Sequence, residues 1–137
     1  MGDDDARYAK NAGAVFSLKY DVVWCPKYRK PVVVDRVEKR LVELITDATE
    51  WRGMTVHALE VMPDHVHPFI ETDPRWAAGE FVGKIKANSS RVLRREFPHL
   101  RTRLPTLFSG SYICSTVGRV SETTVRRYIE AQKGRGR

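Results

Sequence analysis

Hydrophobic and polar residues alternate over residues 15–25, and this period of two predicts a strand with one buried face. The apolar positions are Phe16, Leu18, Tyr20, Val22 and Trp24, and the polar ones between them are Ser17, Lys19 and Asp21. Further strands are predicted over 54–62, from His65 onward and over 112–117. Pro63 and Asp64 supply the turn of a hairpin between the strand over 54–62 and the strand that begins at His65.

Apolar residues recur at helical spacing over 35–52, 73–97 and 122–133, and each of these stretches is predicted to be a helix. The residues that mark their ends are Asp35 as an N-cap, Gly53 as a C-terminal stop, Asp73 followed by Pro74, and Ser121 as a cap of the last helix.

Strands that alternate with helices and include one hairpin predict an α+β fold. We expect a ferredoxin-like or RRM-like antiparallel sheet with helices on one face. The chain has 137 residues, enough for one domain. We expect a flexible leader at 1–14, a single domain over 15–133 and a basic tail at 134–137, where glycine and arginine alternate.

Positive charge exceeds negative charge, since 24 Lys and Arg stand against 17 Asp and Glu and the formal net charge is +7. This balance favours a polyanionic partner such as nucleic acid. No apolar run approaches the length of a membrane span, and residues 1–10 are acidic and polar, unlike a secretory signal. We therefore expect a cytoplasmic protein with no membrane partner, in which Cys25 and Cys114 are reduced thiols.

Two histidines lie two residues apart in an apolar stretch, at His65 and His67. On a strand this spacing aims both imidazoles at the same side of the sheet, and two parallel imidazoles are half of a metal site. Taken by itself, such a pair is more often two unrelated histidines than a ligand pair.

Near the end of the chain, Tyr128 and Gln132 are four residues apart, so they lie one turn apart on the same face of the last predicted helix. From the residues alone, the simplest interpretation is that Tyr128 packs against the sheet and Gln132 lies at the surface.

Basic residues gather in the connector after the first strand and along the second predicted helix. They are Lys27, Arg29, Lys84, Lys86, Arg91, Arg94 and Arg95. A run of charge of this kind is typical of a solvated surface, and the same residues are candidate phosphate contacts if the partner is nucleic acid.

In their order and spacing, four blocks of the chain resemble the single-tyrosine HUH transposases of small bacterial and archaeal insertion sequences, the TnpA-like and REP-associated tyrosine transposase superfamily. The blocks are Trp24 and Cys25 with Lys27, Tyr28, Arg29 and Pro31, then Val61–His67, the helix segment Lys86–Arg91, and the stretch Ser111–Gln132. Together they cover the chain from about Val15 to Gln132.

The resemblance implies a role for the residues singled out above. His65, His67 and Gln132 match the family's metal ligands, and Tyr128, on the C-terminal helix, matches its nucleophile. The implied protein is a DNA transposase that cleaves and rejoins single-stranded DNA at insertion-sequence ends through a 5′-phosphotyrosine intermediate. A cation held by these ligands would polarise the scissile phosphate; the donors suit Mg²⁺ or Mn²⁺, and two histidines do not exclude Zn²⁺.

The resemblance also implies partners: single-stranded DNA hairpins at the element ends, and a homodimer in which the tyrosine helix of one subunit completes the histidine site of the other. Pro68 departs from the family pattern and removes one backbone N–H just after His67. Two alternatives stay open, a domesticated relative that acts on dispersed genomic repeats and a non-catalytic basic nucleic-acid-binding domain.

Overall fold

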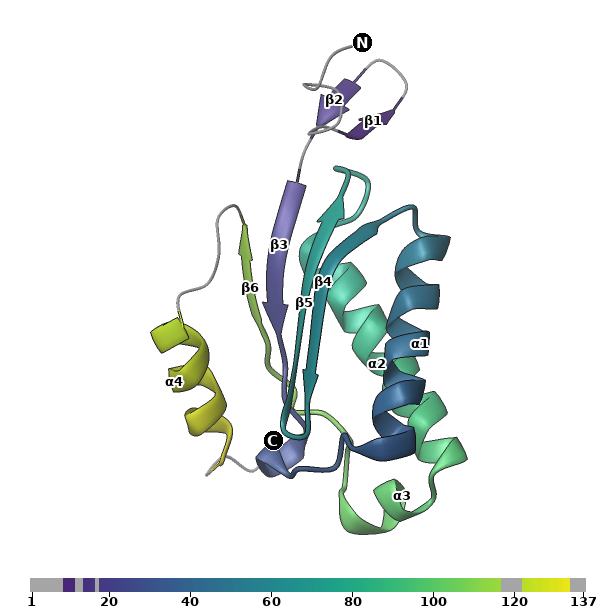
Figure 1. Cartoon of the computed structure of the whole chain (residues 1–137), viewed down its shortest axis with the longest axis vertical. Helices are drawn as coiled ribbons and strands as arrows, with labels where there is room; N and C mark the ends of the chain where they lie inside the picture. The colour runs from purple at the N-terminus through teal and green to yellow at the C-terminus, as the bar shows by residue number, and fades with distance from the viewer. Residues whose placement is uncertain (1–8, 12–13, 17, 117–121, 134–137) are drawn as a thin grey trace.

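A four-stranded antiparallel sheet forms the centre of the protein, which is described by a computed structural model over residues 9–11, 14–16, 18–116 and 122–133 (Figure 1). Its strands are β3 (Leu18–Val23), β4 (Thr55–Met62), β5 (His65–Thr72) and β6 (Ile113–Thr116). The strand order is β4-β5-β3-β6, and each neighbouring pair is antiparallel.

Two long helices, α1 (Asp35–Trp51) and α2 (Ala78–Glu96), pack against each other on one face of this sheet (Figure 1). In chain order the core elements run β3, α1, β4, β5, α2, β6, which is the βαββαβ order of a ferredoxin-like fold. The predicted α+β class and antiparallel sheet are therefore confirmed. Shorter elements are η2 (Lys27–Arg29) after β3 and α3 (His99–Arg103) after α2.

The last helix, α4 (Glu122–Lys133), does not join the layer formed by α1 and α2. It lies beside β6, with its C-terminal end near η2 (Figure 1). Two elements far apart in the sequence, η2 and α4, are thus neighbours in the fold.

The core lies between the sheet and the α1–α2 layer. Residues of β5 alternate in burial, as the period of two of a strand requires, and the inward ones pack against the apolar faces of the two helices. The core residues that are at most 1% exposed on these elements include Val22, Val66 and Ile70 from the strands and Leu41, Ile45, Phe81 and Leu93 from the helices.

The strand predicted over 15–25 is divided in the structure. β2 (Ala14–Phe16) pairs with β1 (Ala9–Asn11) in a separate two-stranded sheet, and β3 begins at Leu18. The reason is the length of the neighbouring strand, because Leu18 pairs with Thr72, the last residue of β5. Residues 1–8, 12–13 and 17 lie outside the described residues, as do the cap Ser121 and the tail 134–137, so those predictions stay untested.

Two predicted helix starts differ from the observed ones. α1 begins with Asp35 as its first residue and Val34 as its N-cap, without a side-chain capping bond. α2 begins at Ala78, because Asp73 Oδ1 accepts the backbone N–H of Arg75 at 2.8 Å and closes a turn ahead of the helix. The predicted stop at Gly53 is confirmed, since its φ of +73° is the left-handed conformation that ends a helix. None of the described helices combines the length and the hydrophobicity needed to cross a lipid bilayer.

Candidate active site

The two histidines of the central motif lie on the sheet face opposite the α1–α2 layer. Along β5 the side chains of Val66, Pro68 and Ile70 are buried, so His65 and His67 point the other way. Their side chains are 15% and 24% exposed, respectively. The prediction that both imidazoles share one side of the sheet is confirmed.

Each imidazole contacts a carboxylate. His65 Nδ1 lies 2.9 Å from Asp64 Oδ1, and His67 Nε2 lies 3.2 Å from Asp21 Oδ1. Glu60 Oε1 is 3.7 Å from the second nitrogen of His65. A carboxylate on one ring nitrogen fixes the orientation of the ring and leaves the other nitrogen to bind elsewhere, an arrangement typical of metal-binding histidines.

Asp21 is a site residue that the sequence did not single out beyond its place on the polar face of a strand. It comes from β3, where it pairs with Phe69 of β5, and this register brings its carboxylate beside His67. Asp21 is only 6% exposed, an uncommon environment for a carboxylate. No spacing along the chain connects it to the histidines, so strand pairing was needed to find it.

Pro68 does not interrupt the strand that carries the histidines. β5 continues to Thr72, and Pro68 pairs with Leu59 of β4 in unbroken sequence with His67. The one irregularity in this ladder is a register shift between Val56 and Ala58, away from the histidines. The missing N–H at Pro68 therefore leaves the geometry of the motif intact.

On α4, Tyr128 and Gln132 both contact the short segment Ser109–Ser111, here called the docking segment. Tyr128 Oη donates to the carbonyl of Ser111 at 2.9 Å. Gln132 Oε1 accepts from Ser109 Oγ at 2.7 Å and from Ser111 Oγ at 3.3 Å. Gln132 is 1% exposed, so the interpretation of this residue as a surface side chain is wrong, and the two residues do share a helical face as predicted.

The docking segment and the histidine strand are both attached to the end of β3. Trp24 exchanges backbone hydrogen bonds with Val66, the residue between the two histidines, at 2.9 and 3.1 Å. The next residue, Cys25, accepts the backbone N–H of Ser109 at 2.9 Å. Two consecutive residues thus hold the two parts of the candidate site, one part with the histidines and the other with Tyr128 and Gln132.

Arg29 connects α4 to the hairpin turn beside the histidines. Its Nη1 donates to Glu130 Oε1 at 2.8 Å, and its Nε lies 3.5 Å from Asp64 Oδ2, the carboxylate that also contacts His65. The arginine side chain is 18% exposed. Here the predicted phosphate contact Arg29 is already engaged by two carboxylates.

Cys25 and Cys114 are free thiols, as the sequence predicted. Burial is the main reason that the pKa of Cys25 is raised to about 12, and the nearby charge of Asp64 raises it further. At neutral pH this thiol is protonated and unreactive. The cysteine at the centre of the site therefore acts as a packing residue and a backbone anchor.

Across the described parts of the chain, no group of three or more His, Cys, Asp and Glu side chains is arranged to hold a metal ion. The histidine pair fits half of such a site, because each ring keeps one nitrogen that is not hydrogen-bonded to Asp64 or Asp21. For His65 this nitrogen faces the exposed Glu60 carboxylate at 3.7 Å, beyond hydrogen-bond distance. A further donor of another type is needed, and the amide oxygen of Gln132 has suitable chemistry for Mg²⁺ or Mn²⁺.

The basic residues predicted to contact DNA fall into two groups. Lys84, Arg91 and Arg95 are exposed on α2. The others are more enclosed: Lys27 and Lys86 are 9% exposed, and Arg94 donates to the carbonyls of Leu104 and Pro105. Lys86 Nζ donates to two backbone carbonyls at 2.8 and 3.0 Å, which favours an internal role over a phosphate contact.

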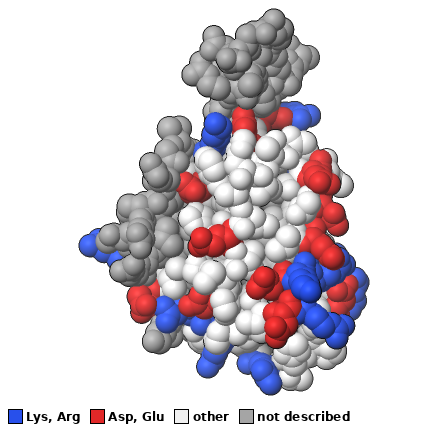
Figure 2. All heavy atoms as spheres, viewed as in Figure 1, with Lys and Arg blue, Asp and Glu red and all other residues white. Residues whose placement is uncertain are grey.

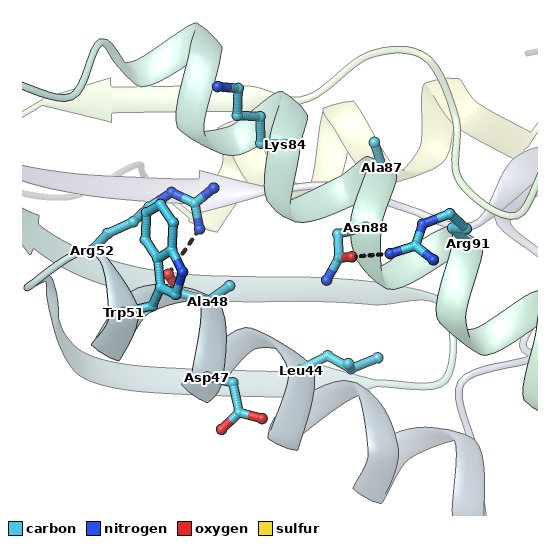
Figure 3. Close-up of a pocket in the computed structure, with 9 residues that line it drawn as sticks. All are labelled: Leu44, Asp47, Ala48, Trp51, Arg52, Lys84, Ala87, Asn88 and Arg91. Carbon is cyan, nitrogen blue, oxygen red and sulfur yellow. Dashed lines mark hydrogen bonds between the residues drawn. The ribbon is translucent and has the colours of Figure 1, made fainter.

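A groove between α1 and α2 contains two of the exposed basic residues, Lys84 and Arg91 (Figure 3). Trp51 stands at one end of it, 73% exposed, with the Arg52 guanidinium 4.6 Å from the centre of its ring. On the α2 side of the groove, Arg91 donates to Asn88 at 2.7 Å. An exposed aromatic ring beside basic groups is the combination that unpaired nucleotides bind.

Positive charge is not spread evenly over the surface. On the side of the molecule seen in Figure 2, uncharged atoms dominate the middle, interrupted by acidic groups, and Lys and Arg lie mainly toward the lower edge. A polyanion would therefore make local contacts with this protein and would not be attracted equally to all of its surface.

The fold and the side chains beside β5 define a small ferredoxin-like protein with a polar, histidine-containing site opposite its main helical layer. The profile of the family described as "Transposase IS200 like" matches residues 14–132. The chain belongs to this family of transposases, and the resemblance found in the sequence is confirmed.

Named relatives agree with this assignment. The chain is 35% identical to the ISDra2 transposase TnpA of Deinococcus radiodurans over 125 residues, which are 90% of this chain and 89% of the relative. It is 25% identical over 134 residues to the transposase for insertion sequence element IS200 of Salmonella typhimurium, covering 96% and 85% of the two chains.

Solved structures support the same fold. The crystal structure of a candidate transposase from Deinococcus radiodurans R1 superimposes with a TM-score of 0.83 at 35% identity, over 90% of this chain and 97% of that one. A REP-associated tyrosine transposase bound to a REP hairpin gives a TM-score of 0.56 at 11% identity, over 89% and 67%. At that identity, the second likeness bears on the fold alone.

Proposed function

We propose that this transposase cleaves and rejoins single-stranded DNA at insertion-sequence ends through a 5′-phosphotyrosine on Tyr128. One observation carries the proposal: Trp24 and Cys25 hold both the strand with His65 and His67 and the segment on which Tyr128 rests. A tyrosine nucleophile and two imidazoles are thereby attached to one short stretch of backbone.

The chemistry assigned to Tyr128 conserves the phosphodiester bond. Its Oη attacks the phosphorus, the bond from phosphorus to the 3′ oxygen breaks, and the phenolic proton ends on the departing 3′ oxygen, directly or through solvent, so that a free 3′-OH leaves. In the reverse step, the 3′-OH of another DNA end attacks the phosphotyrosine and frees Tyr128. In the resting structure the hydroxyl proton points to the carbonyl of Ser111, so this hydrogen bond must break before attack.

Three side chains would hold a divalent cation, Mg²⁺ or Mn²⁺. They are His65, His67 and Gln132, and the bound cation would offset negative charge that develops on the scissile phosphate. Gln132 Oε1 already accepts two hydrogen bonds, so ligation would replace the longer one, at 3.3 Å from Ser111. The 2.7 Å bond from Ser109 would remain and orient the amide.

DNA hairpins at the element ends are the proposed partner, with the exposed basic residues of α2 as phosphate contacts. Lys84 and Arg91 lie in the same groove as the exposed ring of Trp51, so one surface offers both charge and an aromatic face (Figure 3). We expect Lys84→Gln with Arg91→Gln to weaken hairpin binding and to lower the salt dependence of its affinity, by about one counterion for each phosphate contact removed. Lys39→Gln, an exposed substitution on α1, is the control.

The proposed assembly is a homodimer with composite sites, in which α4 of one copy serves the histidines of the other. In such an exchange, α4 of the partner would occupy the place that α4 occupies here, against the docking segment. Mixing two inactive variants tests this arrangement. Tyr128→Phe combined with His65→Ala should regain activity, because one of the two sites in the mixed dimer keeps both residues. If each site were built from a single chain, the mixture would stay inactive.

The proposed reaction is tested by looking for a covalent protein–DNA adduct. Wild-type protein, incubated with single-stranded DNA from the flanks of its own gene and with Mg²⁺ or Mn²⁺, should form a protein–DNA adduct that is stable in denaturing gels. Tyr128→Phe should abolish the adduct, whereas Tyr20→Phe, which removes a hydroxyl from another half-buried tyrosine, should not.

Metal dependence is measured in the same assay. A chelator or His65→Ala should abolish the adduct, and His57→Ala is the matched control because His57 lies on β4 and contacts Glu71, outside the proposed ligand set. Binding of hairpin DNA without any adduct, unchanged by chelator, would instead identify a non-catalytic nucleic-acid-binding domain. An adduct that forms with Tyr128→Phe would overturn the assignment of the nucleophile.

A further inference from the structure

We propose that Lys86 is a positioning residue of the transposase, whose ammonium group holds the docking segment in the position from which Ser109 and Ser111 orient Gln132 and Tyr128. The inference rests on the proposed roles of Tyr128 and Gln132. It assigns to Lys86 a task inside the protein, in place of the phosphate contact expected from the sequence.

The amine of Lys86 is surrounded by two backbone carbonyls and an aromatic ring. Lys86 is on α2, and its Nζ donates to the carbonyl of Ser109 at 2.8 Å and to the carbonyl of Ser111 at 3.0 Å. The same amine lies 5.4 Å from the centre of the Tyr112 ring, which covers it from another side. One side chain therefore connects α2 to both ends of the docking segment.

Each residue held by Lys86 also contacts α4. Ser109 donates through Oγ to Gln132, and the carbonyl of Ser111 accepts from both Lys86 and Tyr128. A shift of the docking segment would consequently move the contacts of both residues at once. Displacements of about 1 Å in such supports can lower reaction rates about 100-fold.

A lysine at this position carries a desolvation cost, because its ammonium group is buried. Lys86 is 9% exposed, and within the described part of the chain its Nζ has no carboxylate partner. Burial lowers the pKa of the amine to about 8. A methionine would fill similar space without this penalty, so packing alone does not account for a lysine, whereas the two converging carbonyls do.

The contacts also separate Lys86 from its basic neighbours on α2. Lys84, two residues earlier, is exposed and pairs with Glu80 at 3.2 Å, and Arg91 points into the groove between the helices (Figure 3). Lys84 and Arg91 thus lie on the outer surface, whereas Lys86 supports the docking segment from inside the protein.

The experiment compares Lys86→Met, Lys86→Arg and the control Lys39→Met, an exposed lysine on α1, in three measurements. Hairpin affinity should stay within about twofold of wild type for Lys86→Met, while the rate of adduct formation at saturating DNA should fall about 10- to 100-fold. Lys86→Arg keeps a cationic donor and should recover much of the rate. Lys39→Met should leave the adduct rate unchanged.

The third measurement does not depend on activity. Amide hydrogen exchange of 109–116 and 122–133 should speed up in Lys86→Met relative to the rest of the protein, and Lys86→Arg should restore slower exchange. Unchanged exchange and an unchanged adduct rate in Lys86→Met would overturn the inference. A loss of affinity that accounts for the whole loss of activity would do so too, because it would make Lys86 a DNA contact.

The adduct assay and the exchange measurement also distinguish a failure of this proposal from a failure of the proposed function. If wild-type protein forms no adduct, the proposed function fails, and the exchange comparison still decides whether Lys86 holds the docking segment and α4. Should Lys86→Met not fold, Lys86→Gln with Ser109→Ala replaces it. Removal of the Ser109 hydroxyl should then cost less in the Lys86→Gln background than in wild type, because both changes act on the same segment, and strictly additive effects would contradict the inference.

Discussion

Because the amine of Lys86 is buried, we expect the free energy of unfolding to depend on pH in a specific way. Burial lowers its pKa from 10.5 to about 8 in the folded protein. Between these values the unfolded chain binds more protons than the folded one, so the free energy of unfolding must rise with pH. Each tenfold change in the proton-binding constant changes the free energy of unfolding by about 1.4 kcal/mol. The fall in pKa from 10.5 to about 8 therefore changes this free energy by at most about 3 kcal/mol.

The test measures unfolding by urea at several values between pH 7 and pH 10, for wild type and for Lys86→Met. The wild-type free energy of unfolding, minus that of the variant, should increase by about 2–3 kcal/mol over this range. Cys25, whose own pKa is raised to about 12, weakens folding at high pH in both proteins, and its contribution largely cancels in the difference.

Lys86→Arg provides a second reference, because arginine keeps its hydrogen-bond donors and does not titrate in this range. The difference between wild type and Lys86→Arg should rise with the same sign. A difference that stays flat, or that falls as the pH rises, would refute the assignment of a buried amine between the two carbonyls of the docking segment.

Three further predictions concern the histidine strand and the fold around it. Asp21→Asn should lower the affinity for Mn²⁺ about 10- to 100-fold in calorimetric titration, since it removes the carboxylate that orients His67; unchanged affinity would exclude that role. Gly53→Ala should cost about 1–2 kcal/mol in chemical unfolding because the residue has a φ of +73°, and an unaltered midpoint would contradict the strain. Val66→Ala should cost roughly 2 kcal/mol, as its side chain is fully buried in the core on the face of β5 opposite the two histidines, and no loss of stability would show that the core closes around the cavity.

Local patterns predicted most of the architecture correctly. The alternation in β3 and the helical spacing in α1 and α2 depend on the neighbours of each residue along the chain, and their classes agree with the structure. Boundaries were less well predicted because they depend on distant partners. β3 begins where the partner strand β5 ends, and the carboxylate of Asp73 binds Arg75 in a turn before α2 and does not cap the helix itself.

The same distinction holds within the candidate site. The spacing of His65 and His67 predicts their common side of the sheet, since the period of a strand is a local property. Asp21 reaches His67 only through the register between β3 and β5. Similarly, Ser109 becomes a partner of Gln132 only after α4 folds back beside β6. Contacts of this kind leave no spacing signal in a single sequence.

The residues at the end of β3 hold two distant parts of the chain, the histidine strand and the docking segment, next to each other. Trp24 bonds to Val66 on one side, and Cys25 bonds to Ser109 on the other, so the two parts of the site share adjacent peptide units. Both anchor residues are at most 1% exposed, and their backbone bonds therefore lie in the buried interior. The position of the histidines is therefore coupled to that of the docking segment through rigid backbone. The described contacts of α4, in contrast, include side-chain hydrogen bonds and the Arg29–Glu130 ion pair, which are individually weak. In the proposed reaction these contacts would break and re-form as Tyr128 approaches the scissile phosphate.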